Sequence, residues 1–352
     1  MLVSIIAFLI MFSVIVLGHE FGHYMIAKRN GIRVVEFDVG MGPTLAHKEM
    51  GGTDFCLKLL PVGGACIFDG MDVLLEGGSI DDLDEHSFPK ANVFARIATV
   101  LGGPVMNFII GLVFATLIVA FSGTDLPNVQ QVVDGSVAQE AGLQAGDTIK
   151  CINGEHIHVY REVQLFSMVN YGEPLDIVYE RDGQDHEVTL TPRYDKDAQR
   201  YLIGLVGGSY TKMGALQTFQ YGFYEAEYWV RATFKSLGLI FRGHFSPDDL
   251  SGPVGIVKVV DDTYTETKSY GIPTVLLSFL NLTTLFSINL GIMNLLPIPA
   301  LDGGRLLLLI IEAVRGKRLD PNKESIVTAA GAMFLIGLMV FVLFNDVTKF
   351  FR

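Results

Sequence analysis

The sequence predicts a polytopic α-helical membrane protein that also carries a membrane-associated β element and one α+β domain outside the membrane. Half of the 352 residues are hydrophobic, 18% are charged and the mean hydropathy is +0.40, which is too apolar for an ordinary soluble protein of this length. A helix needs roughly 20 apolar residues to cross the hydrocarbon core of a bilayer. Four apolar runs reach that length, at 2–26, 93–121, 274–296 and 325–345.

The first span, residues 1–27, ends in the motif His19-Glu20-Phe21-Gly22-His23. Two histidines at this spacing share one face of a helix, so both imidazoles can reach one Zn²⁺ while Glu20 stands beside it as a general base. Ionisable side chains are costly inside a bilayer, so three of them in one turn and a half indicate a metal site. No Lys or Arg precedes the apolar run and no small-residue cleavage site follows it, so we expect the span to be retained rather than removed as a signal peptide.

Basic residues give the predicted orientation of the spans, because cytoplasmic loops next to spans carry an excess of Lys and Arg. Residues 122–273 and both termini then face outside. The 122–273 segment contains 12 basic and 21 acidic residues, which leaves no basic footprint for nucleic acid. The basic residues that give this orientation follow the first span or lie between the last two: Lys28, Arg29, Arg33, Arg315, Lys317, Arg318 and Lys323.

The cytoplasmic segment 28–92 contains a predicted β element at about 38–70. Glycines alternate there with β-prone residues, and Gly51-Gly52 supplies the positive φ that a tight hairpin turn requires. An exposed strand edge can bind an extended peptide, and a protease needs its substrate extended. We therefore predict a membrane-associated hairpin that receives a second chain. The alternative is an ordinary cytoplasmic loop.

The second span, residues 93–121, contains Gly102-Gly103-Pro104-Val105-Met106-Asn107. The glycines permit close approach of another helix, and Asn107 places a polar amide within the membrane. Two roles for Asn107 are open. It can hydrogen-bond between helices, which is a common use of Asn in a membrane bundle, or it can hold substrate or solvent near the metal.

Residues 122–208 are predicted to form one compact α+β domain. Short strands are expected at 129–133, 148–152, 175–180 and 186–191, with a helix near 160–170. The stretch from Ala141 to Glu155, in which Asn153-Gly154 makes a turn, resembles the signature of PDZ domains. The Arg200–Leu205 stretch resembles the carboxylate-binding loop that bacterial permuted PDZ domains carry near their C-terminal end.

Residues 209–273 are predicted to form an amphipathic helix and a linker. Apolar residues recur there at steps of three and four, while charges of both signs occupy other faces. Charges of both signs argue against a fifth span. The helix is expected either at the membrane surface or under the PDZ-like domain, and a packed core helix is an equal alternative.

A catalytic zinc centre usually has three protein ligands, so the two histidines require a third. Asp302 follows two prolines at the end of the third span, 274–305. Irregular backbone at membrane depth is tolerated where it lines a wet cavity or is buried in protein, so this segment is expected to face such a cavity. Asp302 is the only Asp or Glu between Glu266 and Glu312, which makes it the candidate ligand. The alternative is a turn residue at the cytoplasmic interface. A cytoplasmic loop at 306–324 and a fourth span within 325–352 complete the predicted chain.

Together these motifs resemble the bacterial site-2 proteases of the RseP/RasP type. The resemblance implies an intramembrane metalloprotease whose Zn²⁺ is held by His19, His23 and Asp302. Glu20 would be the catalytic base. The matching stretches run in family order over nearly the whole chain, at His19–His23, Pro61–Gly64, Gly103–Asn107, Ser251–Ile256 and Asn294–Arg305.

The resemblance also implies how substrate is bound and what it is. Asn294 would help to hold substrate together with the β element, and we expect Gly63, Gly64 and Asn107 to contribute. Substrates would be single-span proteins of the bacterial cytoplasmic membrane, either anti-sigma factors first trimmed outside by another protease or remnant signal peptides. The chain departs from some relatives in having one PDZ-like domain rather than two in tandem, so size filtering by a PDZ pair is not carried over.

Two functions from other classes are open. A PDZ-bearing membrane scaffold or chaperone could retain a vestigial metal site, although the intact Glu20 argues against degeneration. A metal transporter is the second alternative, because intramembrane His and Asp also mark ion pathways. It predicts that metal accumulates in vesicles without peptide products.

Overall fold

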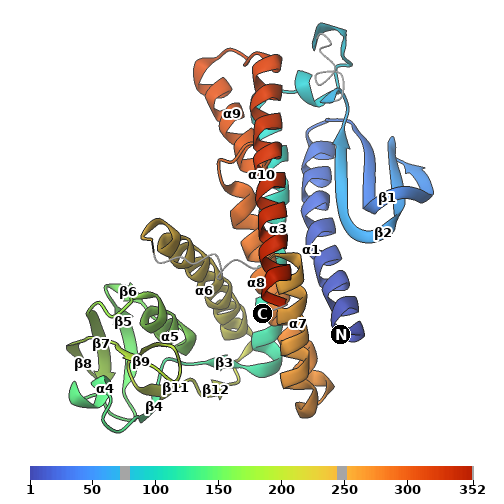
Figure 1. Cartoon of the computed structure of the whole chain (residues 1–352). Coiled ribbons are helices and arrows are strands. Elements are labelled where there is room, and N and C mark those ends of the chain that lie inside the picture. The colour runs from blue at the N-terminus through green and yellow to red at the C-terminus, as the bar shows by residue number, and fades with distance from the viewer. Residues whose placement is uncertain (72–79, 244–251, 351–352) are drawn as a thin grey trace. The chain divides into compact units, whose positions relative to one another are not determined.

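A computed structural model describes residues 1–71, 80–243 and 252–350 of the chain (Figure 1). The chain forms two compact units, of which the first comprises Met1–Gly111 and Ser246–Arg352 and the second Leu112–Phe245. Helix α3 runs across this division, so its beginning belongs to the first unit and its end to the second.

Four helices of the described part of the chain are long and apolar enough to cross a membrane, which agrees with the number of spans predicted. Their apolar side chains remain largely exposed. Only 11% of the most apolar stretch of α10 and 22% of that of α1 are buried, as expected for helices that are hydrophobic all round and face lipid. The four helices are α1 (Leu2–Arg29), α3 (Val93–Ser122), α8 (Ile272–Leu295) and α10 (Pro321–Phe350).

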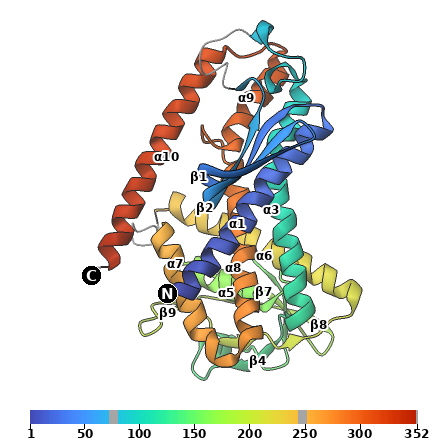
Figure 2. The ribbon, with the colours of Figure 1, turned by 90° about the vertical axis from the view of Figure 1, so that its right-hand side faces the viewer.

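The predicted β element is a bent hairpin that lies along α1 (Figure 1, Figure 2). Strand β1 (Val34–Met50) pairs with β2 (Thr53–Phe68), and Gly51 and Gly52 turn the chain with φ of 61° and 73°. The predicted turn is confirmed, and the strands begin earlier and run longer than expected. Val39 is in register with both Leu57 and Gly64, so β2 folds back and flanks the start of β1 on both sides.

An apolar cluster joins this hairpin to the helices of the first unit. Thr53, which is fully buried, donates a hydrogen bond of 2.8 Å to the carbonyl oxygen of Val34 and ties the two strands together at the cluster. The hairpin is therefore anchored to the helices that carry the candidate metal ligands. The buried members of the cluster are Ala27, Ile32, Val34, Phe68, Phe88, Val100 and Leu309.

Two helices of the first unit differ from the sequence prediction. Helix α9 (Asp302–Arg315) occupies much of the segment predicted as a loop at 306–324, and α7 (Pro253–Thr267) lies in the predicted linker. Their 14 and 15 residues are too few to span a bilayer, so a search for spans passes over them. Ser251, which begins one of the family motifs, lies outside the described residues.

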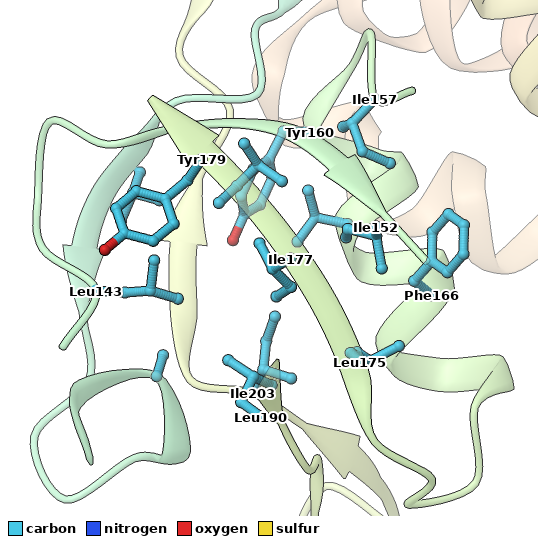
Figure 3. Packing of buried hydrophobic residues seen from close by; sticks show 14 residues of the cluster. Leu143, Ile152, Ile157, Tyr160, Phe166, Leu175, Ile177, Tyr179, Leu190 and Ile203 are labelled. Carbon is cyan, nitrogen blue, oxygen red and sulfur yellow. The ribbon is translucent and has the colours of Figure 1, made fainter. Parts of the chain in front are cut away.

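The second unit contains the α+β domain, built on a four-stranded antiparallel sheet of order β6-β5-β7-β8. Ile152, Ile177 and Phe166 belong to its buried core, which Figure 3 shows between the sheet and α5 (Tyr160–Val169). The predicted strands and helix are confirmed within a few residues. The strands are β3 (Thr124–Asp125), β4 (Val129–Val132), β5 (Thr148–Ile152), β6 (Glu155–His156), β7 (Leu175–Arg181), β8 (Gln184–Leu190), β9 (Arg193–Asp195), β10 (Arg200–Leu202), β11 (Leu205–Gly207) and β12 (Tyr210–Thr211), and a short helix α4 (Val137–Glu140) follows β4.

Helix α6 (Ala215–Phe241) packs on this domain through its charged face. Arg161 of α5 pairs with Glu225, and Arg231 of α6 pairs with Glu162 of α5 at 3.1 Å. The helix therefore lies against the α+β domain, which is one of the three alternatives left open by the sequence. Its exposed apolar side chains are Leu216, Phe219, Phe223, Phe234 and Ile240.

Candidate metal centre

Three atoms that can bind a metal meet where α1 lies beside the start of α9. Nε2 of His19 is 3.1 Å from Oδ2 of Asp302, and Nε2 of His23 is 3.3 Å from the same oxygen. The two Nε2 atoms are 3.1 Å apart. Both imidazoles are buried, and Asp302 is half-buried. The structure therefore brings together the three residues that the sequence singled out as metal ligands.

The dimensions of this triangle fit zinc. Ligand atoms bound to a tetrahedral Zn²⁺ stand about 3.3 Å apart, close to the separations of 3.1 to 3.3 Å found here. Oδ2 of Asp302 is a buried atom without a hydrogen-bond partner among the described residues, which is costly unless a cation satisfies it. Two imidazoles and a carboxylate form a donor set known in catalytic zinc sites, with the fourth position open.

A sharply folded connection carries Asp302 to the histidines. Helix α8 ends at Leu295, and Leu296 is extended because Pro297 follows it. A Cβ on Gly303 would overlap the carbonyl oxygen of Leu296, so α9 starts directly against the connection that precedes it. The prolines and glycines of this motif therefore serve the same purpose, which is to let the chain fold tightly between α8 and α9.

Gly103 of α3 packs against the imidazoles, and Gly102 packs against α1. A Cβ on Gly103 would overlap Nε2 of His23 and stand 2.7 Å from Cε1 of His19. A Cβ on Gly22 of α1 would overlap the carbonyl of Gly102, so the two helices touch backbone to backbone. The close helix approach expected from the glycine pair is confirmed, but its direct role beside the imidazoles was not foreseen.

The outer nitrogens of both imidazoles have partners on α3. Nδ1 of His23 lies 2.9 Å from the carbonyl oxygen of Thr99, and Nδ1 of His19 lies 3.1 Å from the side-chain amide of Asn107. Such partners orient the rings of metal-binding histidines. Sequence reasoning missed Thr99, because a backbone acceptor has no signal in the residue type.

Two of the residues predicted to hold substrate lie close to Glu20 or to His19. A Cβ on Gly64 of β2 would come within 3.4 Å of Cγ of Glu20, and the amide nitrogen of Asn294 lies 3.5 Å from Nε2 of His19. Gly63 packs against Met41 within the hairpin. Asn107, the fourth of these residues, is fully buried behind His19.

A second group of potential ligands lies on the hairpin. Atoms of Glu36, Asp38 and Cys56 come within 4.8 Å of one another. The ammonium group of Lys58 already occupies this group, with Nζ 2.7 Å from Glu36 and 3.1 Å from Asp38. Because the chain supplies its own cation there, we interpret the group as an ion-pair network rather than a metal site.

Comparison with known proteins gives independent findings. The model of peptidase family M50 matches residues 7–338. The Eep protein of Enterococcus faecalis is 34% identical over 429 aligned positions, which cover 99% of each chain. The zinc metalloprotease RasP of Geobacillus kaustophilus is 33% identical, covering 99% of this chain and 98% of its own. The regulator of sigma-W protease RasP of Bacillus subtilis is 31% identical, covering 99% of each chain.

These relatives differ from this chain in length. The alignment with Eep has 429 positions and this chain has 352 residues, so at least 77 positions of that alignment have no counterpart here. A protein of Clostridium acetobutylicum does not show this difference, since it is 33% identical over 344 residues that cover 98% of this chain and 97% of its own. Among solved structures, a PDZ domain of an SdrC-like protein from Listeria monocytogenes covers 24% of this chain and 87% of its own, with 23% identity and a TM-score of 0.21.

Proposed function

Because this chain belongs to peptidase family M50, we propose that it cleaves the membrane-spanning segments of single-span membrane proteins. The chain is a zinc metalloprotease of the site-2 type and a multi-pass membrane protein. The observation that carries the proposal is the triangle of ligand atoms from His19, His23 and Asp302, with Glu20 beside it. Since α1 is apolar enough to lie within a bilayer, the reaction takes place at membrane depth.

In this proposal His19, His23 and Asp302 hold the metal, and Glu20 moves the proton. Zinc, when bound, supplies the Lewis acidity that makes water nucleophilic near neutral pH and polarises the peptide carbonyl. The carboxylate of Glu20 takes a proton from the attacking water. It then delivers that proton to the nitrogen of the leaving amine as the C–N bond breaks.

The hairpin presents the substrate in extended form. A helical peptide bond is shielded and hydrogen-bonded, so the segment must unwind before its carbonyl can reach Glu20. Ser13 of α1 donates a hydrogen bond of 2.7 Å to the carbonyl of Pro61, and Gly64 lies against Glu20, so this part of β2 runs beside the catalytic base. We assign Gly63 and Gly64 to binding of the unwound strand, which pairs with a sheet edge as in other peptide complexes.

Asn294 completes the proposed substrate site. Its amide lies on the side of His19 that faces Asp302, where it can donate to a substrate carbonyl beside the metal. An amide at this place aligns the scissile bond without adding a charge to the membrane interior.

The PDZ-like domain is proposed to control access from outside. A groove lies between α5 and residues 202–207, which overlap the Arg200–Leu205 stretch that resembles a carboxylate-binding loop, and Gly204 has a φ of 82° within it. Backbone loops of this kind can capture a C-terminal carboxylate. The domain would therefore either recognise the new C-terminus of a trimmed substrate or exclude an untrimmed one by its bulk.

The proposed substrates are anti-sigma factors already trimmed outside, or remnant signal peptides. The name of the Bacillus subtilis relative, a regulator of sigma-W protease, supports the first class. Basic residues in the last turn of α1, Lys28 and Arg29, support an orientation in the bacterial cytoplasmic membrane with the PDZ-like domain outside.

The test is cleavage of a single-span reporter by the full chain purified in detergent. We expect the wild type to cut within the membrane segment, and Glu20→Gln or a zinc chelator to stop the reaction. Equal cleavage in all three samples would reject the proposal. Uptake of zinc into vesicles without peptide products would favour a metal transporter instead.

The gating role needs its own experiment. Deletion of about residues 128–205 should allow untrimmed reporter to be cut, whereas the full chain should cut only the trimmed form. Unchanged selectivity after the deletion would reject the gating role and leave the protease proposal intact.

A further inference from the structure

Among the residues that the structure describes, one polar group lies within hydrogen-bonding distance of the Asn107 side chain. The residue is fully buried on α3, and its amide lies 3.1 Å from Nδ1 of His19. The amide oxygen as placed has no hydrogen-bond partner among the described residues. A buried amide is costly when it is only partly hydrogen-bonded, so the reason for its presence should lie in the one contact that it makes.

The other imidazole shows what such a contact must do. Nδ1 of His23 lies 2.9 Å from the carbonyl oxygen of Thr99, and a carbonyl oxygen can only accept. The hydrogen of His23 is therefore on Nδ1. That leaves the lone pair on Nε2, the atom that lies 3.3 Å from Asp302.

His19 needs the same tautomer, because it also directs Nε2 at Asp302. Its Nδ1–H then requires an acceptor, and the amide oxygen of Asn107 can provide one. The nitrogen and oxygen of an amide occupy nearly equivalent positions and are assigned from their partners, so half a turn about the Cβ–Cγ bond of Asn107 brings the oxygen to Nδ1. In the opposite orientation Asn107 would donate to Nδ1, the hydrogen would sit on Nε2, and His19 could not bind a metal.

We propose that Asn107 is a positioning residue whose side-chain oxygen accepts the Nδ1–H of His19 and holds this imidazole in its metal-binding tautomer and orientation. The inference rests on the proposed metal site. The contact joins α3 to α1, as the interhelical role considered from the sequence requires, and its partner is a proposed ligand of the metal. The contact between α3 and α8 is made separately, by the hydroxyl of Ser287, which donates 2.8 Å to the backbone oxygen of Asn107.

The experiment measures zinc affinity of the full-length protein in detergent, by competition with a chromophoric chelator after removal of metal. Asn107→Leu keeps the volume and removes the acceptor. We expect it to weaken zinc binding about 10- to 100-fold, the usual effect of losing a partner of a metal-binding histidine. Asn107→Asp keeps an acceptor oxygen, so we expect it to bind zinc within a few-fold of wild type.

A spectrum of the cobalt-loaded protein separates positioning from general damage. We expect Asn107→Leu to change the visible cobalt bands, because His19 is no longer held in place, whereas Asn107→Asp keeps them. Ser287→Ala is the matched control, since it removes the neighbouring hydrogen bond at the same helix crossing but leaves the amide. It should retain both the zinc affinity and the cobalt spectrum.

The outcomes distinguish this inference from the proposed function. Wild-type zinc affinity and an unchanged cobalt spectrum in Asn107→Leu would overturn the role of Asn107. Equal losses in Asn107→Leu, Asn107→Asp and Ser287→Ala would also overturn it, because they would indicate damage to the helix crossing. Wild-type zinc affinity in His19→Ala and His23→Ala would instead overturn the metal site itself.

Discussion

Gly103 lies against Nε2 of His23 so closely that no methyl group fits between them. The same glycine faces His19, so a single backbone position on α3 lies against both imidazoles. The backbone of α3, rather than a side chain, therefore limits the space beside the proposed metal ligands. The helix cannot yield locally, because α1 and α3 are already in backbone contact at Gly22 and Gly102.

Gly103→Ala should remove zinc and activity together. The added Cβ is fixed to the helix backbone, so the imidazoles must turn away from Asp302. We expect zinc affinity to fall by about 100-fold or more, which equals or exceeds the effect of removing a hydrogen-bond partner of a metal-binding histidine. Zinc content after dialysis and cleavage of a single-span reporter are the two measurements.

Gly111→Ala is the matched control on the same helix. Its Cβ would meet Cγ1 of Ile288 at 2.6 Å, where the neighbour is an aliphatic side chain of α8 rather than a metal ligand. We expect this variant to bind zinc normally. If Gly103→Ala bound zinc as well as Gly111→Ala does, the space between Gly103 and the imidazoles would not limit zinc binding.

Asp302→Ala and Glu20→Gln should both lose activity, but for different reasons. Asp302 is one of three proposed ligands, so its loss should lower zinc affinity by at least about tenfold. Glu20 is assigned to proton transfer, so Glu20→Gln should keep a full equivalent of zinc while cleavage falls by at least about 100-fold. Metal analysis beside a cleavage assay separates the two. Loss of zinc in Glu20→Gln would contradict the division of roles.

Lys58 is predicted to hold the bent hairpin in its substrate-binding shape. Its ammonium group donates hydrogen bonds to Glu36 at 2.7 Å and Thr44 at 3.1 Å, and it lies 3.1 Å from the carboxylate of Asp38. Lys58→Met removes these bonds and leaves two carboxylates close together. We expect kcat/KM to fall about tenfold, chiefly through KM, while zinc content stays the same.

Lys48→Met provides the comparison for Lys58. Lys48 is exposed on β1 of the same hairpin. Its replacement by Met therefore changes the net charge equally but leaves the contacts of Lys58 intact. Cleavage by Lys48→Met should match wild type. Equal KM values for the two variants would show that charge, and not the shape of the hairpin, accounts for the effect.

The chemistry of the site could be predicted from sequence where a residue type has few uses in a membrane. His19, His23 and Asp302 are polar groups in or next to apolar helices, and a shared metal is one of the few arrangements that accommodates them. The turn at Gly51 and Gly52 was predictable for a similar reason, because paired glycines readily adopt positive φ.

The other features of the site and the fold depend on contacts or lengths that a local sequence pattern does not predict. Thr99 acts through its backbone carbonyl, which every residue possesses. Lys58 finds Glu36 only because β2 folds back over β1, and strand alternation does not specify such a bend. Helix α9 was missed because its 14 residues fall below the length that a search for spans detects.

A buried carboxylate in the second unit should make its stability depend on pH. Burial raises the pKa of Glu225 to about 6, and Arg161 only partly opposes this. Asp125, which pairs with the same arginine, raises the pKa further. Burial also raises the pKa of Glu162, which faces the same helix. The folded unit therefore holds protons that an unfolded chain releases near pH 4.5.

The sign follows from this difference in proton binding. Between about pH 4.5 and 6 the folded state binds more protons than the unfolded state, so the free energy of unfolding falls as pH rises, by about 1–2 kcal/mol for Glu225. Trp229, the single tryptophan of the chain, lies on α6 and reports this unit in denaturant titrations. Glu225→Gln should flatten the decline, whereas Glu227→Gln on the same helix should leave it. If the denaturant midpoint of the wild type rose between pH 4.5 and 6, the pairing with Arg161 would outweigh burial in setting the pKa of Glu225.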